Sequence, residues 1–286
     1  MHHPASLKGF TIVVAGKGGT GKTLVSALLV RDQRKHGAVL AIDADADSNL
    51  PEALGVRASR TVADLREKIT GYKTRRTDTS AATAEQLVEQ YLMEAIVEEK
   101  EFDLLVMGRG EGEGCYCAIN HLLRGIIDTQ ARNYPTVVVD SEAGLEHISR
   151  RTARDVDVML VMTDPTTKGI GTARRVAELA RELKVHFGRL LVLVNKTTPA
   201  TEGLMEDYLR QEGLELIGFL PFDPAVAEND ARGKPVWEIP EGQPILRSAE
   251  KIFARLDAIR EEKKRASATG STTPGDNTAA GAKAPT

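Results

Sequence analysis

Cysteine is scarce in this chain, and so are aromatic residues and long apolar runs. The 286 residues include two cysteines, and aromatic residues make up 4%. Two cysteines one residue apart do not make the disulfide framework of a small secreted scaffold, so we expect a reduced, cytoplasmic protein. No apolar run approaches the ~20 residues of a membrane span, and the first ten residues lack the apolar segment of a signal peptide.

The chain also lacks a strong charge of either sign. Its net charge is −3, so no global field attracts nucleic acid or an anionic membrane, and we expect neither as a partner. Hydrophobic residues make up 41% and charged residues 28%, which is the ordinary balance of a soluble globular protein. The length suits one large α/β domain or two small ones.

Short apolar runs recur along the chain, with stretches of helical spacing between them. Such uninterrupted runs are typical of strands buried on both faces of a parallel sheet. They are Thr11–Ala15, Val39–Asp43, Asp103–Met107, Thr136–Asp140, Val158–Thr163, Leu190–Asn195 and Leu216–Leu220. Helical spacing is clearest in residues 23–37 and 171–185. The alternation predicts an α/β fold with a doubly wound, mainly parallel sheet flanked by helices.

Three segments depart from this alternation. Residues 71–100 form an insertion before the third run, whose second half has helical spacing up to Val97. Residues 249–265 predict a closing amphipathic helix, which we interpret as packing on the core rather than lying on a membrane surface. Residues 266–286 contain almost no large apolar side chain, so we expect a disordered tail after a single domain over residues 1–265.

The stretch "AGKGGTGKT" contains the pattern of a phosphate-binding loop. Gly16, Gly21, Lys22 and Thr23 satisfy G-x-x-x-x-G-K-[ST], after a predicted strand and before a predicted helix. Glycines allow backbone N–H groups to converge on an anion, and the helix N-terminus adds its partial positive charge. We expect Lys22 to reach the β- and γ-phosphates of a nucleotide and the Thr23 hydroxyl to bind Mg²⁺. A glycine-rich turn with a chance lysine is the alternative.

Three carboxylates follow other predicted strands. Asp140 ends one strand and is the candidate that holds the water of a bound metal ion. Asp43 and Asp45 follow the second strand, and one of them is the candidate that orients the attacking water. Ligands of α/β folds bind at the carboxyl ends of strands, which favours function over a merely solvated turn.

"KGGTGKT", "DADADSNL" and "VVVDSEAG" resemble the deviant phosphate loop and the two switch segments of the MinD/ParA/nitrogenase-iron-protein superfamily. The resemblance implies a Mg²⁺-dependent ATPase that forms a homodimer, in which Lys17 reaches the phosphates of the partner subunit. It also implies that Asn195 contacts adenine and that "FLPFDPAVAEND", residues 219–230, covers the base through Pro221, Phe222 and Asp223. The nucleotide contacts that it implies in the first loop are Gly16, Lys17, Gly18, Gly19, Thr20, Gly21, Lys22, Thr23 and Leu24.

The two cysteines lie together in the glycine-rich run "GRGEGEGCYC". Cys115 and Cys117 are too close for an easy disulfide, but both thiols can chelate one metal ion. A tetrahedral site usually needs four ligands, which two subunits supply when a two-fold axis passes through the ion. His121 and, similarly, His147 are alternative ligands for a site within one chain, and two inert buried thiols are a third reading.

"GRGEGEGCYC", "LLRGII" and "DSEAGLEHISRRT" resemble the CooC-type ATPases. The resemblance implies a role in inserting nickel into carbon monoxide dehydrogenase, with Ni²⁺ or Zn²⁺ held between subunits by Cys115 and Cys117. Two other functions stay open: an electron-transfer ATPase with an iron–sulfur cluster at the same interface, and a partition or positioning ATPase. Soft thiolates suit nickel and zinc alike, so the residues do not choose between the two metals.

Overall fold

The computed structural model describes residues 9–64, 93–108, 133–141, 156–182 and 187–269. The cysteine pair and both candidate histidines, His121 and His147, lie outside these ranges, as do the second switch segment after Ser141 and most of the insertion and tail. The positions of these residues therefore remain sequence-based predictions.

The described residues form an eight-stranded sheet in the order β3-β4-β2-β5-β1-β6-β7-β8. All neighbouring strands pair parallel except β3, which runs antiparallel to β4. The strands are β1 (Phe10–Gly16), β2 (Val39–Ala44), β3 (Val97–Glu98), β4 (Phe102–Val106), β5 (Thr136–Ser141), β6 (Val156–Thr163), β7 (Phe187–Thr197) and β8 (Leu216–Pro221). Each of the seven predicted strands is present, within about three residues of its predicted ends.

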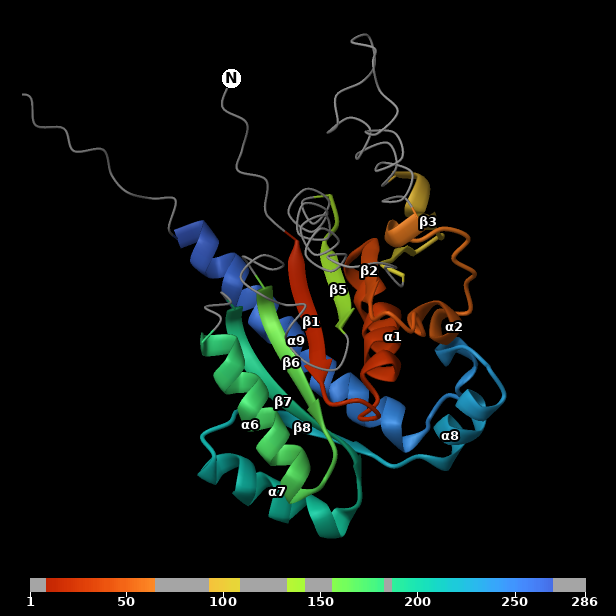
Figure 1. Cartoon of the computed structure of the whole chain (residues 1–286). Helices are drawn as coiled ribbons and strands as arrows, with labels where there is room; N and C mark the ends of the chain where they lie inside the picture. The colour runs from red at the N-terminus through yellow and green to blue at the C-terminus, as the bar shows by residue number, and fades with distance from the viewer. Residues whose placement is uncertain (1–8, 65–92, 109–132, 142–155, 183–186, 270–286) are drawn as a thin grey trace, which may run out of the picture.

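Helices cover both faces of the sheet, as the sequence predicts (Figure 1). One face packs on α1, α2 and α9, and the other packs on α6 and α7. The α-helices are α1 (Lys22–Gln33), α2 (Leu50–Leu54), α6 (Thr167–Glu182), α7 (Pro199–Gln211), α8 (Pro224–Ala231) and α9 (Pro244–Thr269). Two short 3₁₀ turns, η1 (Arg34–His36) and η2 (Val236–Glu238), follow α1 and precede α9.

The central strand β1 shows how the sequence produces these two layers. Phe10, Ile12 and Val14 face the α1 and α9 side, whereas Val13 and Ala15 face the α6 and α7 side. All five side chains are buried, because successive strand residues point to opposite faces and both faces are covered. The apolar run in the sequence is therefore the signature of a central parallel strand.

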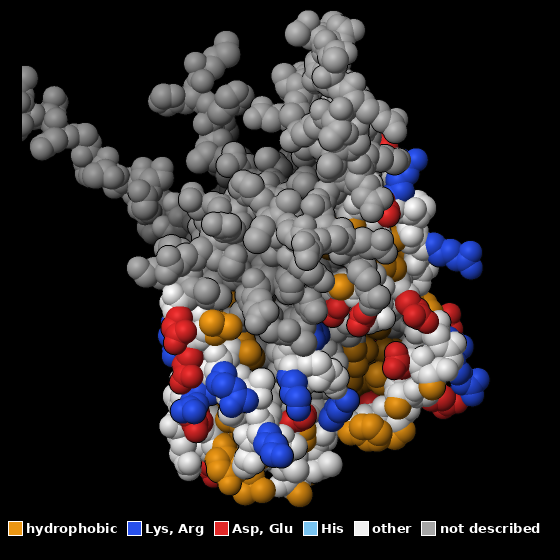
Figure 2. Space-filling model, in the orientation of Figure 1, with side chains coloured by type: hydrophobic (Ala, Val, Ile, Leu, Met, Phe, Trp, Pro, Cys, Tyr) orange, Lys and Arg blue, Asp and Glu red, His pale blue; other side chains and the backbone are white. Residues whose placement is uncertain are grey.

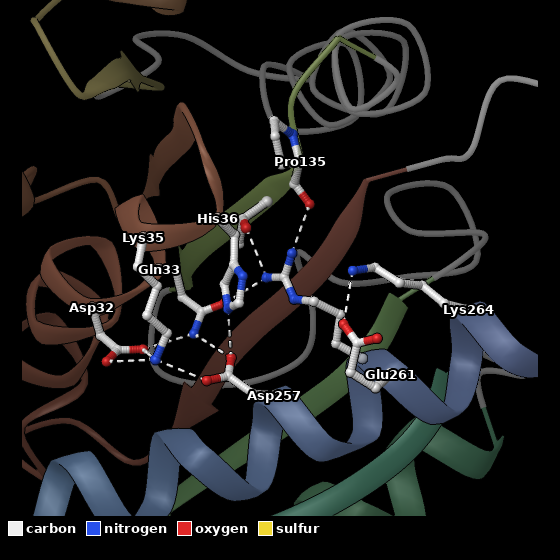
Figure 3. Close-up of polar contacts among 10 residues, drawn as sticks. Asp32, Gln33, Lys35, His36, Pro135, Asp257, Glu261 and Lys264 are labelled. Atoms are coloured by element: carbon white, nitrogen blue, oxygen red, sulfur yellow. Dashed lines mark hydrogen bonds and ion pairs between the residues drawn. The ribbon is translucent and has the colours of Figure 1, made fainter.

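A buried polar cluster fixes α9 to the sheet and to the end of α1 (Figure 3). The guanidinium of Arg260 donates to the Pro135 carbonyl at 3.1 Å and also to Gln33. One helical turn earlier, Asp257 accepts from Gln33 at 3.1 Å and contacts His36 at 2.9 Å. The terminal nitrogens of Arg260 have hydrogen-bond partners, whereas its buried Nε has none among the described residues. The hydrogen bonds that are made favour one position of α9 on the sheet, because each would be lost if the helix moved.

Two boundaries differ from the sequence-based expectation. Val97, which the helical spacing assigns to a helix, lies in β3 because it pairs with Leu104 at the sheet edge. Helix α9 ends at Thr269, four residues beyond its predicted end at Arg265, since Ala266–Thr269 continue the helix. Among the described residues, no helix has both the length and the apolar character needed to cross a membrane.

Candidate nucleotide-binding site

The loop between β1 and α1 has the backbone geometry of an anion-binding loop. Gly16, Gly19 and Gly21 have φ values of 144°, 78° and 89°, a region that strains any residue with a side chain. A Cβ on Gly21 would lie 2.4 Å from Nδ2 of Asn195, so any larger residue there would also displace the Asn195 side chain. The loop leads directly into α1, whose first N–H groups lack partners within the helix.

Two lysines of the loop differ in their environment. Lys22 is buried, and its ammonium lies 3.5 Å from the carbonyl oxygen of Lys17, inside the curve of the loop. The Thr20 hydroxyl donates to the same carbonyl at 2.8 Å, which closes the loop around that oxygen. The side chain of Lys17 is exposed, as required of a group that reaches outside its own subunit.

Asp140, at the end of β5, lies beside the start of α1. Its carboxylate accepts hydrogen bonds from the hydroxyls of Ser26, at 3.0 Å, and Thr23. Burial raises the pKa of Asp140 to about 6, although these two hydrogen bonds and the positive charge of Lys22 oppose the rise. A carboxylate fixed next to the Thr23 hydroxyl fits the donor set of a Mg²⁺ site, with oxygen ligands and room for water.

Asp43, at the end of β2, is also buried and organises the segment that follows it. Its two carboxylate oxygens accept from the backbone N–H of Asp45 at 3.0 Å and of Leu50 at 2.9 Å. Burial, together with the negative charge of Asp140, raises the pKa of Asp43 to about 7. Asp43 therefore holds the turn that carries Asp45, and its predicted part in catalysis stays a prediction.

Two residues near the end of β7 donate hydrogen bonds to backbone carbonyl groups of the phosphate loop. The buried amide of Asn195 donates to the Thr20 carbonyl at 2.8 Å, and the ammonium of Lys196 donates to the Gly19 carbonyl at 3.0 Å. Lys196 has a φ of 59°, which directs its side chain back over the loop. Asn195 thus lines the site through a loop contact, and its predicted contact with adenine stays a prediction.

The segment that follows β8, with Phe222 and Asp223, forms another wall of the site. Phe222 is 57% exposed, whereas Asp223 is buried. One oxygen of Asp223 caps α8 by accepting from Ala225 at 3.0 Å, and the other accepts from Ile245 in α9 at 3.3 Å. Both helix starts are thereby fixed by one carboxylate. The sequence marks this residue for nucleotide binding, and the structure adds this capping role.

A cavity of about 610 Å³ connects these elements at the carboxyl ends of the strands. The predicted residues that line it are Gly18, Gly19, Gly21, Lys22, Thr23, Leu24, Asp45, Asn195, Pro221, Phe222 and Asp223. Gly16, Lys17, Thr20, Asp43 and Asp140 do not line it, and all but Lys17 are buried around its wall. A cavity of this volume, with a phosphate loop at one end, suits a nucleoside triphosphate.

The sequence reasoning missed several lining residues: Asp47, Asn49, Lys196, Val226, Ala227, Asp230 and Ile245. Lys196 and Asp47 are detectable in principle, because they directly follow a predicted strand or a candidate carboxylate at the ligand-binding edge. The three on α8, Val226, Ala227 and Asp230, lie in the segment that the resemblance implies covers the base, although the sequence analysis names only Pro221, Phe222 and Asp223 as contacts there.

The described residues contain no group of three or more His, Cys, Asp or Glu side chains that would hold a metal ion. Cys115 and Cys117 lie outside these residues, so the interfacial metal site stays a prediction from the sequence.

Comparison with known proteins gives a consistent family assignment. The sequence model of the CobQ/CobB/MinD/ParA nucleotide-binding domain matches residues 11–236. An uncharacterized ATP-binding protein of Methanocaldococcus jannaschii is 46% identical over 86% of this chain and 97% of the relative. The carbon monoxide dehydrogenase accessory protein CooC of Rhodospirillum rubrum is 33% identical over 87% of this chain and 96% of the relative.

Solved structures agree on the fold. The MinD cell division protein of Aquifex aeolicus matches with a TM-score of 0.65 and 24% identity, over 87% of this chain and 97% of that chain. A ParA-family ATPase from Chlorobium tepidum matches with a TM-score of 0.64 and 17% identity, over 84% and 96% of the two chains. At these identities the structures establish the architecture alone.

Proposed function

The chain belongs to the CobQ/CobB/MinD/ParA family of nucleotide-binding domains and is a phosphate-loop ATPase, and we propose that it helps insert nickel into carbon monoxide dehydrogenase. The observation that carries the proposal is the similarity to CooC over nearly the whole of both chains, together with the Cys-x-Cys pair. The more similar relative, at 46% identity, has no assigned activity and adds nothing for or against this role.

The described residues support the ATPase part of the proposal. Lys22 supplies positive charge inside the phosphate loop, and the fixed pair of Thr23 and Asp140 fits Mg²⁺. Mg²⁺, when bound, neutralises charge on the phosphate oxygens. Asp45 borders the cavity on a turn held by Asp43, where it orients the water that attacks the γ-phosphate. Phosphoryl transfer needs mainly such positioning and charge stabilisation.

The metal part of the proposal rests on symmetry. Nickel, or zinc in its place, is the cargo, bound by Cys115 and Cys117 of one subunit and the same thiolates of a second subunit. Lys17 reaches across the same homodimer interface to the phosphates of the other subunit. ATP binding and hydrolysis would then change the interface that holds the metal, which couples nucleotide turnover to metal release.

A positioning function is the second candidate, because MinD proteins occur among both the sequence relatives and the solved structures. Such a role predicts recruitment to a membrane or a DNA surface with ATP and no need for the cysteines. An interfacial iron–sulfur cluster, the third candidate, predicts visible absorption in anaerobically purified protein. These observables separate the three candidates.

The test is nickel-dependent activation of carbon monoxide dehydrogenase purified without nickel. The full chain with ATP should accelerate activation, whereas Lys22→Ala and the double change of Cys115 and Cys117 to Ser should not. Lys251→Ala, at an exposed position on α9 outside the cavity, is the matched control for the lysine change. Equal activation by the wild type and the double cysteine variant would refute the nickel-insertion proposal and leave the ATPase assignment intact.

A further inference from the structure

A second cavity, of about 340 Å³, adjoins the nucleotide cavity between α2 and α8. The two cavities share Thr23, Leu24, Asn49, Val226 and Asp230. The second cavity alone is lined by Glu52, Ala53, Asn229, Gly233, Lys234, Val236 and Ile239. Figure 2 shows apolar side chains recessed on the side of the molecule where α2 and α8 lie, with acidic side chains around them.

The shared residues indicate which part of a nucleotide would face the second cavity. This step rests on the proposed nucleotide site. In the proposed site the phosphates lie at residues 18–23 and the base lies beside Asn195 and Phe222, and all of these positions except Thr20 line the larger cavity. Leu24 and Val226 line both cavities, and the ribose connects the phosphates to the base, so the ribose is the part that we assign to the opening of the second cavity.

The chemistry of the lining selects against an anion. Glu52 and Asp230 contribute carboxylates, and the ammonium of Lys234 is paired with Glu238 at 2.8 Å. Both available N–H groups of Asn229 serve the protein, since its Nδ2 donates to the carbonyls of Lys234 and Pro235 at 2.8 Å and 3.0 Å. A phosphate would therefore meet two carboxylates and a lysine that already has a partner.

The remaining lining suits an uncharged group with an apolar body. Leu24, Ala53, Val226, Val236 and Ile239 supply apolar surface. Asn49, at the N-cap of α2, makes no capping hydrogen bond with its side chain, so its amide can serve a carbonyl or an amine. This combination of apolar surface and a few polar groups is that of a small-molecule site.

Contacts within the protein pre-organise the wall formed by α2 and η2. The indole N–H of Trp237 donates to the Leu54 carbonyl at 2.8 Å, and the ring stacks on Phe102 at 5.9 Å between centroids. Pro235 lies so close to Gly55 that a Cβ there would be 3.0 Å from the proline ring. The cavity therefore exists without closure of a loop, and a ligand would not have to order this wall.

We propose that the second cavity accepts an uncharged substituent carried on the ribose of the bound adenine nucleotide, and that it rejects a phosphate at the same position. The cavity thereby determines which substituents on the ribose hydroxyls the ATPase accepts. An anthraniloyl ester of the ribose 2′- or 3′-hydroxyl is a suitable probe, because it is neutral, planar and fluorescent.

The experiment compares the affinities of ATP, anthraniloyl-ATP and ATP with a 3′-phosphate for the full chain. Anthraniloyl-ATP should bind at least as tightly as ATP, and the 3′-phosphorylated nucleotide should bind about tenfold or more weakly, a difference of ~1.4 kcal/mol. Trp237 is the single tryptophan of the chain and adjoins Val236 of the cavity wall. Excitation of Trp237 should therefore produce anthraniloyl emission through energy transfer.

Variants locate the effect in the cavity. Ala53→Phe fills it and should weaken anthraniloyl-ATP by about tenfold while ATP changes less than about twofold. Ala200→Phe, on the exposed surface of α7, is the control and should change neither. Glu52→Gln keeps the size of the side chain and should improve binding of the 3′-phosphorylated nucleotide alone. Its result stands even if Ala53→Phe does not fold.

Two results would overturn the proposal. One is tenfold weaker binding of anthraniloyl-ATP than of ATP to the wild type, and the other is an equal effect of Ala53→Phe on both nucleotides. No binding of ATP itself would instead refute the nucleotide site on which this inference rests, so the two failures are distinguishable.

Discussion

Asp43 and Asp140 are register partners at the carboxyl ends of the neighbouring parallel strands β2 and β5, and both side chains are buried. Two carboxylates in adjacent buried positions repel each other when both are ionised. Their pKa values rise to about 7 and about 6, so Asp43 is the group that keeps a proton near neutral pH. Asp43 holds the turn that carries Asp45, and Asp140 accepts a hydrogen bond from Thr23, so the pair links these two parts of the site.

The stability of the nucleotide-free protein should therefore fall as pH rises. The folded-state pKa of Asp43 lies above its ordinary value of 3.8, so the folded state holds the proton more tightly than the unfolded state. This contribution to stability is fully present below the ordinary value and is lost as pH rises through about 7. Urea titrations should show a loss of up to ~4 kcal/mol in the free energy of unfolding across this window.

Asp43→Asn removes the titration of this group and should make the pH dependence shallower, with the contribution of Asp140 left in place, even though the absolute stability changes as one acceptor is lost. Asp207→Asn, on the exposed surface of α7, is the control and should leave the slope unchanged. An equally steep slope in Asp43→Asn would contradict the assignment of the proton to this pair.

Lys22→Ala should abolish ATP hydrolysis while the fold survives. Its ammonium lies inside the phosphate loop, and removal of one charge-stabilising donor typically costs about 10²–10³-fold in kcat. Steady-state hydrolysis and circular dichroism check the two halves of the prediction, with Lys251→Ala as the control for an exposed lysine. Turnover at the wild-type rate in folded Lys22→Ala would remove the phosphate-loop assignment.

Lys17→Ala should lose ATP-stimulated dimerisation and hydrolysis together, because this exposed lysine is predicted to act on the partner subunit's phosphates. Asp45→Ala should bind ATP but hydrolyse it slowly. An equal mixture of the two variants should recover about a quarter of wild-type activity, since about half of the dimers are mixed and each has one intact site. No recovery, with mixed dimers shown to form, argues against action across the interface.

Gly21→Ala should disable nucleotide binding, because it places a Cβ 2.4 Å from the Asn195 amide at a φ of 89°. The left-handed backbone alone costs about 1–2 kcal/mol, and displacement of Asn195 frees the Thr20 carbonyl that it holds. Gly203→Ala on α7 is the matched control, since a Cβ there meets nothing within 4 Å. It should be neutral or stabilise by up to ~1 kcal/mol. Calorimetric titration with ATP compares the two, and equal affinities would contradict the predicted role of Gly21.

The sequence predicts the sheet well because strands buried on both faces must be apolar throughout. Val137, Val138 and Val139 in β5 are all buried, and they stand in the sequence as an uninterrupted run. The two-residue strand β3 has no such signal, since Val97 gains its strand geometry from the edge of β4. Tertiary pairing therefore overrides the local helical spacing at this position.

The candidate site is predictable where chemistry depends on spacing along the chain. The phosphate loop and the carboxylates after β2 and β5 are of this kind. Asp230 and Ile245 line the cavity only because α8 and α9 are seated by Asp223, a contact between distant segments. Lys196 directly follows a predicted strand, but its φ of 59° and its contact with the Gly19 carbonyl have no signal in the sequence.

The ratio of bound metal to protein, measured together with molecular mass, is the decisive test of a metal ion shared between two subunits. The purified chain is dialysed against Ni²⁺ or Zn²⁺, with and without ATP, and its mass is followed by light scattering. We predict one ion per dimer through Cys115 and Cys117, metal-driven dimerisation without nucleotide, and weaker binding as pH falls, because the thiols must lose protons. Changing both cysteines to Ser should remove the metal and spare ATP binding. One ion per monomer without a change in mass would contradict the shared site and favour a single-chain site with His121.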